Sequence, residues 1–172
     1  MEKILELIKC IDGIEGIEGF VEAKPIKADT VVTAFWVRFK CKYACNNYNT
    51  NLDCPPYSPS PEETAEFLKA FDDAILIQCK DGYDAASKIA ITLEKIAIGW
   101  EFYRAMAFGA GSCKHCTTCN LNSCINRDIT RPSMESSGID VVETAKNNGY
   151  EMVKYNEDGS RSLYHYSLLL VR

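Results

Sequence analysis

The sequence is poor in histidine and has no long apolar run, and these shortages exclude several kinds of protein. Only two of the 172 residues are histidine, so metal sites built mainly from imidazole are excluded. No apolar stretch reaches the roughly 18 residues that a membrane-spanning helix needs. Glu, Lys, Asp and Gly interrupt the N-terminal stretch, so we expect no signal peptide and no membrane span, and therefore a cytoplasmic protein.

An excess of positive charge is also missing. The chain has 19 Lys and Arg against 24 Asp and Glu, scattered along its length, and a net charge of −5. This balance argues against a nucleic-acid partner held through phosphate contacts. The sequence has no Gly-rich phosphate loop and no G-x-S-x-G motif, and neither histidine has a setting that suggests Cys–His catalysis.

Cysteine, in contrast, is abundant, with nine residues in a chain long enough for one domain, residues 1–172, with a real core. A small secreted protein with this density would be a disulfide scaffold. Here the count is odd and no export signal is apparent, which favours metal or redox chemistry. Soft thiolate ligands select zinc, copper(I) or iron–sulfur clusters.

Four of these cysteines, Cys113, Cys116, Cys119 and Cys124, lie in the segment 109–138 with the spacing C-x2-C-x2-C-x4-C. Bacterial ferredoxins use C-x2-C-x2-C-x3-C-P, so the first two spacings agree and the third is one residue longer. Structural zinc sites usually take two cysteines from each of two separate turns. We therefore predict a [4Fe–4S] cluster on these four residues, with zinc and metal-free thiols or disulfides as alternatives.

A second cysteine-rich segment runs from residue 41 to 61, where Cys41, Cys45 and Cys54 have the spacing C-x3-C-x8-C and two prolines follow. Asn, Asp, Ser and Pro predict a loop, and long loops in compact domains are often functional. We predict a second metal site with three protein thiolates, or a site shared with the first set; some of the three are free thiols in the alternative. Candidates for the fourth ligand are Cys124, Cys79, Asp53 and a non-protein ligand.

Other residues near these motifs each allow two interpretations. Arg127 and Arg131 neutralise the charge of a cluster or are solvated surface residues, and His115 is a surface residue or a donor to the cluster. Cys10 and Cys79 behave as small buried apolar side chains.

Apolar periodicity and turn residues predict a small single-domain α/β (α+β) sandwich. One mixed sheet is covered by helices, and both cysteine loops emerge at one end. Ser60-Pro61-Glu62-Glu63 is a strong helix start. The expected helices are 2–12, 60–71, 83–107 and 138–149, and the expected strands are 17–26, 30–39, 74–79 and 162–171.

Three stretches carry a resemblance to a known family: VRFKCKYACNNYNTNLDCPPYSPSPEE, AFGAGSCKHCTTCNLNSC and RPSMESSGIDV. Over about residues 35–145 the chain resembles the uncharacterised prokaryotic family of predicted metal-binding proteins, the DUF2284 type. The resemblance implies a small cysteine-rich metalloprotein of bacteria and archaea and brings no known reaction. It implies metal ligation by Cys41, Cys45, Cys54, Cys113, Cys116, Cys119 and Cys124.

The motifs therefore favour an iron–sulfur protein with one or two clusters that transfers electrons to or from an enzyme partner. A redox partner protein is expected, and a homodimer stays open. One alternative is an enzyme that uses a cluster with an open iron. The other is a module in which zinc ties long loops to the core.

Overall fold

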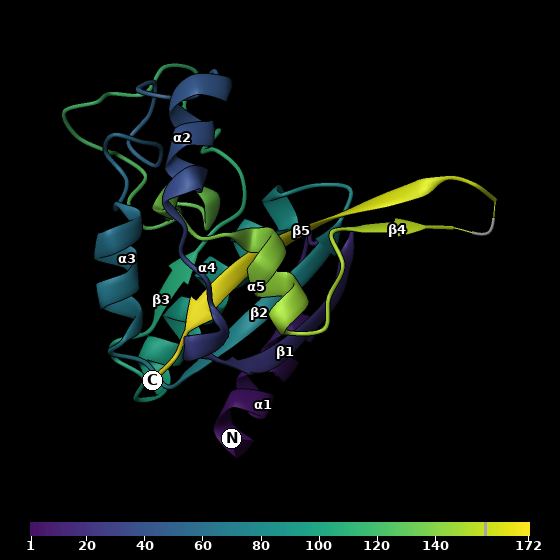
Figure 1. Ribbon diagram of the computed structural model, residues 1–172. Coiled ribbons are helices and arrows are strands. Elements are labelled where there is room, and N and C mark those ends of the chain that lie inside the picture. The colour runs from purple at the N-terminus through teal and green to yellow at the C-terminus, as the bar shows by residue number, and fades with distance from the viewer. Residues whose placement is uncertain (157) are drawn as a thin grey trace.

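The fold is built around an antiparallel sheet in the order β1-β2-β5-β3, with β4 pairing to β5 outside this path (Figure 1). The structure is a computed structural model that describes residues 1–156 and 158–172. The strands are β1 Phe20–Lys27, β2 Asp73–Lys80, β3 Met106–Phe108, β4 Val153–Tyr155 and β5 Arg161–Leu170. The helices are α1 Glu2–Lys9, α2 Phe35–Ala44, α3 Pro61–Leu68, α4 Asp84–Trp100 and α5 Val141–Asn147, with 3₁₀ turns η1 Cys10–Gly13, η2 Ala28–Thr30 and η3 Glu135–Ser137. The α+β class is confirmed, but every pairing between these strands is antiparallel, so the sheet is not mixed.

The strand β2, which includes the predicted strand 74–79, lies in the middle of the sheet. It pairs with β1 on one side and β5 on the other. Successive side chains of a strand point to opposite faces, and both faces of β2 are buried. Ile75 and Ile77 belong to one apolar layer, and Ala74 and Leu76 belong to the other.

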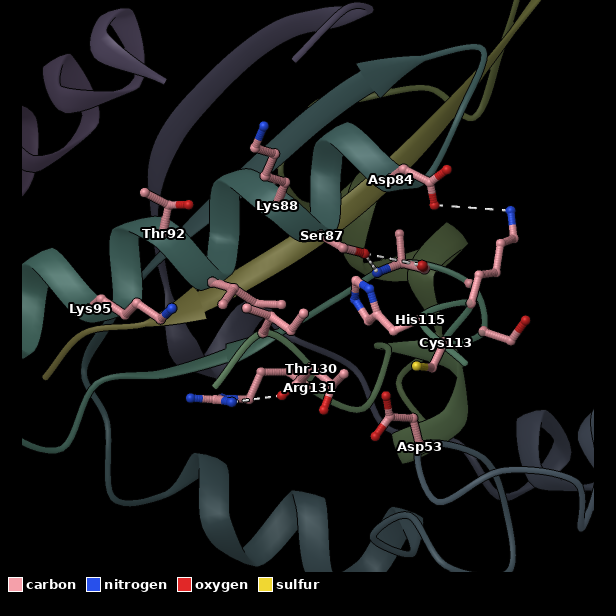
Figure 2. Close-up of a pocket in the computed structure, with 16 residues that line it drawn as sticks. Asp53, Asp84, Ser87, Lys88, Thr92, Lys95, Cys113, His115, Thr130 and Arg131 are labelled. Atoms are coloured by element: carbon pink, nitrogen blue, oxygen red, sulfur yellow. Dashed lines mark hydrogen bonds and ion pairs between the residues drawn. The ribbon is translucent and has the colours of Figure 1, made fainter. Parts of the chain in front are cut away.

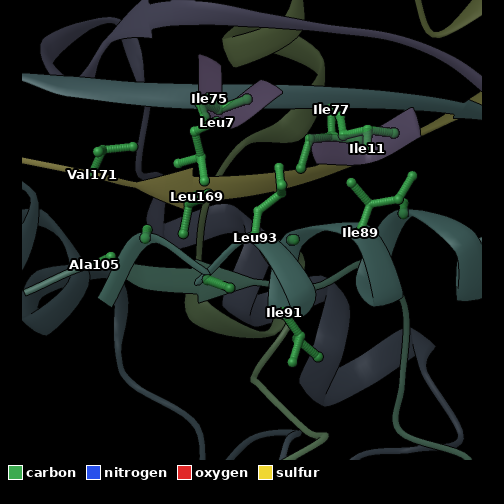
Figure 3. Packing of buried hydrophobic residues seen from close by; sticks show 14 of the residues in the cluster. Leu7, Ile11, Ile75, Ile77, Ile89, Ile91, Leu93, Ala105, Leu169 and Val171 are labelled. Atoms are coloured by element: carbon green, nitrogen blue, oxygen red, sulfur yellow. The ribbon is translucent and has the colours of Figure 1, made fainter. Parts of the chain in front are cut away.

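Helices cover both faces of the sheet. Leu7 and Ile11, from α1 and the turn after it, and Leu93, from α4, pack on the layer of Ile75 and Ile77 (Figure 3). On the opposite face the apolar side chains come from α3, α5 and the segment around η3, and they are Leu68, Phe71, Met134, Ile139, Val141 and Ala145. The sheet thus lies between two apolar layers.

The predicted start of α3 is confirmed in atomic detail. The backbone N–H of Glu63 donates to Ser60 Oγ over 3.1 Å, and the N–H of Ser60 donates to Glu63 Oε2 over 2.7 Å. Pro61 occupies the first helical position, where no backbone donor is needed. This capping box fixes where the cysteine segment 41–61 ends.

The prediction of a strand over residues 30–39 is wrong, because Phe35–Ala44 forms the helix α2. Phe35, Phe39 and Tyr43 follow one another at four-residue steps, and their ring centroids lie 5.2 and 5.7 Å apart. Aromatic contacts at this spacing stabilise a helix and outweigh the β preference of the individual residues. The cysteine segment 41–61 therefore begins on a helix, and only its later part is a loop.

The predicted helix over 83–107 is too long. The helix α4 ends at Trp100, and Glu101 takes a φ of 129°. The chain then returns as β3, whose Ala107 pairs with Leu169 of β5. The predicted helix was too long because the apolar residues that follow α4 form a buried strand, and an apolar run alone does not distinguish a helix from a buried strand. Strand β4 was not predicted.

The helix α2 and both cysteine segments lie at one end of the molecule, and the two termini lie at the other (Figure 1). This placement agrees with the sequence prediction. Among the helices of the described residues, none combines the length and apolar character needed to cross a membrane.

Candidate metal centre

The loop that carries Cys113 to Cys124 is pinned at its base. Gly109 forms a parallel bridge with Ser133; its N–H donates to the Pro132 carbonyl over 2.9 Å, and its carbonyl accepts from Met134 N–H over 3.0 Å. A Cβ at position 109 would lie 2.9 Å from Ser87 Oγ, so only glycine allows this approach. Both ends of the loop are therefore held against α4 and β3.

All four cysteines of this loop line one cavity of about 350 Å³. The opposite wall comes from the other cysteine segment, through Asn47 and residues 50–53. Asn47 Nδ2 also donates to Ser112 Oγ over 3.1 Å. The two cysteine segments thus meet in space, although Cys41, Cys45 and Cys54 do not line this cavity.

Asn126 ties two of these sulfurs together. Its side-chain Nδ2 donates to Cys116 Sγ over 3.1 Å, and its backbone N–H donates to Cys124 Sγ over 3.4 Å. Donors to sulfur stabilise the thiolate form and tune the potential of a bound cluster. Sequence reasoning missed Asn126, although its position two residues after Cys124 was a signal.

The donor set has the chemistry of a thiolate metal site, but no coordination sphere is preformed. In the described residues no three His, Cys, Asp or Glu side chains converge closely enough to hold a metal ion. Burial raises the pKa of the Cys113 thiol. A metal must therefore displace protons from thiols and draw the sulfurs of the cavity together.

The other three cysteines lie on α2 and in the loop that follows it. Cys41 lies on α2, Cys45 follows its last residue, and Cys54 is 6% exposed. Burial raises the pKa of the Cys54 thiol to about 11, and the neighbouring charges of Cys45 and Cys41 act in the same direction. In the described residues these three thiols do not form a group that could hold a metal ion as they stand.

Glu135 is a neighbour of this set that sequence reasoning missed. The Cys41 thiol lies 3.9 Å from the Glu135 carbonyl oxygen. Burial raises the pKa of the Glu135 carboxyl, and its Oε2 is buried without a hydrogen-bond partner among the described residues. No local pattern marks this residue, because it is 94 positions from Cys41.

Asp53 belongs to the cysteine segment 41–61 and faces Cys113 of the other segment (Figure 2). Burial raises the pKa of its carboxyl, while a hydrogen bond with Cys113 and the charges of His115 and Arg131 act in the opposite direction. The Asp53 carboxyl is therefore directed to the four-cysteine set, although Asp53 directly precedes Cys54.

Two cysteines lie apart from both sets. Cys79 on β2 is fully buried in the apolar layer beneath α1 and α4. Cys10 is packed against the same layer, with its thiol 3.6 Å from the Glu6 carbonyl oxygen. Cys79 is therefore not available as a fourth ligand.

Arg131 has a partner other than a cluster. Its Nε donates to both carboxylate oxygens of Glu94 over 3.0 Å, and Glu94 Oε2 also accepts from Ala107 N–H over 2.6 Å. The Glu94 side chain is 3% exposed. The Arg131 charge thus serves mainly to balance a buried carboxylate, whereas Arg127 is exposed.

A second cavity of about 530 Å³ adjoins the first at Cys113 (Figure 2). It shares Asp53, Cys113 and Thr130 with the cysteine-lined cavity. Side chains of α4 form its far wall, and the polar ones among them are Asp84, Ser87, Lys88, Thr92 and Lys95. A small molecule in this space would lie beside Cys113.

Four cysteines line one cavity of this small α+β domain, and Cys113 also lines the second cavity. The chain matches the family described as predicted metal-binding protein (DUF2284) over residues 24–171, and it belongs to that family. No curated protein and no solved structure is significantly similar to it. The match confirms the resemblance and extends it at both ends.

Proposed function

We propose that the protein binds a [4Fe–4S] cluster through Cys113, Cys116, Cys119 and Cys124. The observation that carries the proposal is that all four cysteines line a single cavity in one loop. Three sulfurs at three-residue steps can each reach a different iron, as in ferredoxin loops. The donors from Asn126 to two sulfurs support a site for thiolates.

We further propose that the cluster exchanges electrons with an enzyme partner. The four cysteines are partly exposed, which suits electron transfer at a protein surface. Nearby, α2 exposes Phe35, Trp36, Phe39 and Tyr43 together with Lys40 and Lys42. Exposed aromatic residues are enriched at protein interfaces, and the two lysines favour a redox partner with an acidic surface.

The redox activity is tested on protein purified under strictly anaerobic conditions. We expect a brown protein whose visible absorbance is bleached by dithionite and restored by a mild oxidant. Bleaching that cannot be reversed would contradict a role in electron transfer, even if the cluster itself were present.

The second cavity supports one alternative, an enzyme in which a cluster iron without a cysteine ligand binds substrate. The cavity of about 530 Å³ beside Cys113 would hold that substrate. The two functions differ in whether every iron carries a protein ligand. A zinc-stabilised module is the other alternative, and its metal would distinguish it from both.

A further inference from the structure

The second cavity, of about 530 Å³, lies between α4 and the loop that carries Cys113 (Figure 2). One face of α4 forms its helical wall, because Ser87, Ile91 and Lys95 follow one another at four-residue steps. Ser87 Oγ donates to the Ala110 carbonyl over 3.2 Å and accepts from the Ala110 N–H over 2.9 Å. The helix is thus fixed to the segment just before Cys113, and the fold itself sets the width of the cavity.

Lys95 brings an unbalanced positive charge to this cavity. In Figure 2 its amine lies on the same side of α4 as Arg131, whereas Lys88 points away from them. The Lys88 amine donates to a backbone carbonyl over 2.5 Å, and Lys114 Nζ lies 3.9 Å from Asp84 Oδ1. Among the described residues the Lys95 amine has no ion-pair partner, so its charge is available to a ligand.

Arg131 adds one more donor to the cavity lining. A guanidinium group has five N–H donors, and four of them are engaged here. Nε and one N–H of Nη2 bind Glu94, and both N–H groups of Nη1 donate to the carbonyls of Arg127 and Thr130. The second N–H of Nη2 has no partner in the part of the chain that the structure describes. Because the charges of Arg131 and Glu94 balance each other, Lys95 decides the sign of the charge here, and it favours an anion.

The remaining lining decides how an anion would be oriented. Ile91 is 7% exposed and Ile129 is 38% exposed, and both line the cavity. In Figure 2 Asp53 and Cys113 lie at the opposite end of the cavity from Lys95. The Asp53 carboxylate would repel an anionic group, so the negative end of a ligand belongs at Lys95 and its carbon skeleton along the two isoleucines.

We propose that this cavity binds a small organic anion, a carboxylate or a phosphate ester, with its anionic group at Lys95 and the free N–H of Arg131. The volume of about 530 Å³ lies within the range of small-molecule sites. The other end of the bound molecule lies beside Cys113. The inference goes beyond the proposed electron transfer, because that function needs no small-molecule ligand.

The test titrates the full-length, anaerobically purified protein with butyrate and with butyramide in a calorimeter. The two molecules have nearly the same shape and differ in charge. We expect a Kd on the order of 1 mM for butyrate and a Kd at least about tenfold higher for butyramide, which lacks the charge that Lys95 attracts. Butyl phosphate distinguishes the two head groups: a lower Kd than that of butyrate identifies a phosphate ester as the ligand class, and a higher one a carboxylate.

A pair of variants places the anion in the cavity. Lys95→Gln, at an exposed position of α4, should raise the Kd of butyrate by at least about fivefold and leave that of butyramide unchanged. The matched control is Lys9→Gln, at an exposed position of α1, which should leave both Kd values unchanged.

Three results would overturn the inference. They are the same Kd for butyrate and butyramide, the same butyrate Kd in Lys95→Gln and Lys9→Gln, and no saturable binding of either butyrate or butyl phosphate. None of them bears on the proposed cluster, because iron and sulfide are measured separately on the same samples.

Discussion

Replacing Cys116 with serine should remove most of the metal from the four-cysteine loop. Cys116 lines the same cavity as the other three cysteines of this loop, and its sulfur accepts a hydrogen bond from Asn126. A serine hydroxyl is a hard and weakly acidic donor that does not replace a thiolate on a soft metal. Because no coordination sphere is preformed, the loop depends on the metal to draw its sulfurs together. We therefore also expect faster proteolysis within residues 109–133 of the variant.

The matched control for this variant is Cys10→Ser. Cys10 lies at the end of α1, packed against the apolar layer and outside both cysteine sets. The control should keep its full metal content, measured by elemental analysis of anaerobically purified protein. Equal metal content in the two variants would refute the assignment of Cys116 as a ligand.

Replacing Arg131 with methionine should lower the free energy of unfolding by roughly 3 kcal/mol, because it leaves a buried carboxylate without its charged partner. The Glu94 side chain is 3% exposed and Arg131 is 20% exposed, so this value is at the lower end of the range for buried ion pairs. Denaturant unfolding of the metal-free protein measures the effect.

Two further variants determine the origin of that loss. Arg127→Met, at an exposed position of the same loop, should change the free energy of unfolding by less than about 0.5 kcal/mol. Changing Glu94 to glutamine together with Arg131→Met should recover part of the loss, because the unpaired charge is gone. A metal-free Arg131→Met protein as stable as the unmodified one would contradict the structural role. It would favour the other prediction, that Arg131 neutralises the charge of a cluster.

The sequence predicted those parts of the fold that depend on local pattern. A short apolar run identified β2, and Ser60 with Glu63 identified the start of α3. The helix α2 was missed because aromatic contacts between Phe35, Phe39 and Tyr43 form only once the helix exists. The strands β3 and β4 are three residues long, which is too short for a periodic signal.

The candidate site, too, was predicted only where it depends on local pattern. Cysteine spacing predicted two thiol sets, and the structure places both cysteine segments at one end of the fold. The polar residues that lie beside these cysteines could not be predicted, because their partners are distant in sequence. Glu135 meets Cys41 across 94 positions, and Asp53 meets Cys113 only through the packing of two loops.

The most direct measurement is the content of iron, zinc and acid-labile sulfide per chain after strictly anaerobic purification. We expect about four or eight irons with a matching amount of sulfide, which correspond to one or two cubane clusters. Colourless protein with one or two zinc ions and no sulfide would contradict the cluster and identify a zinc-stabilised module instead.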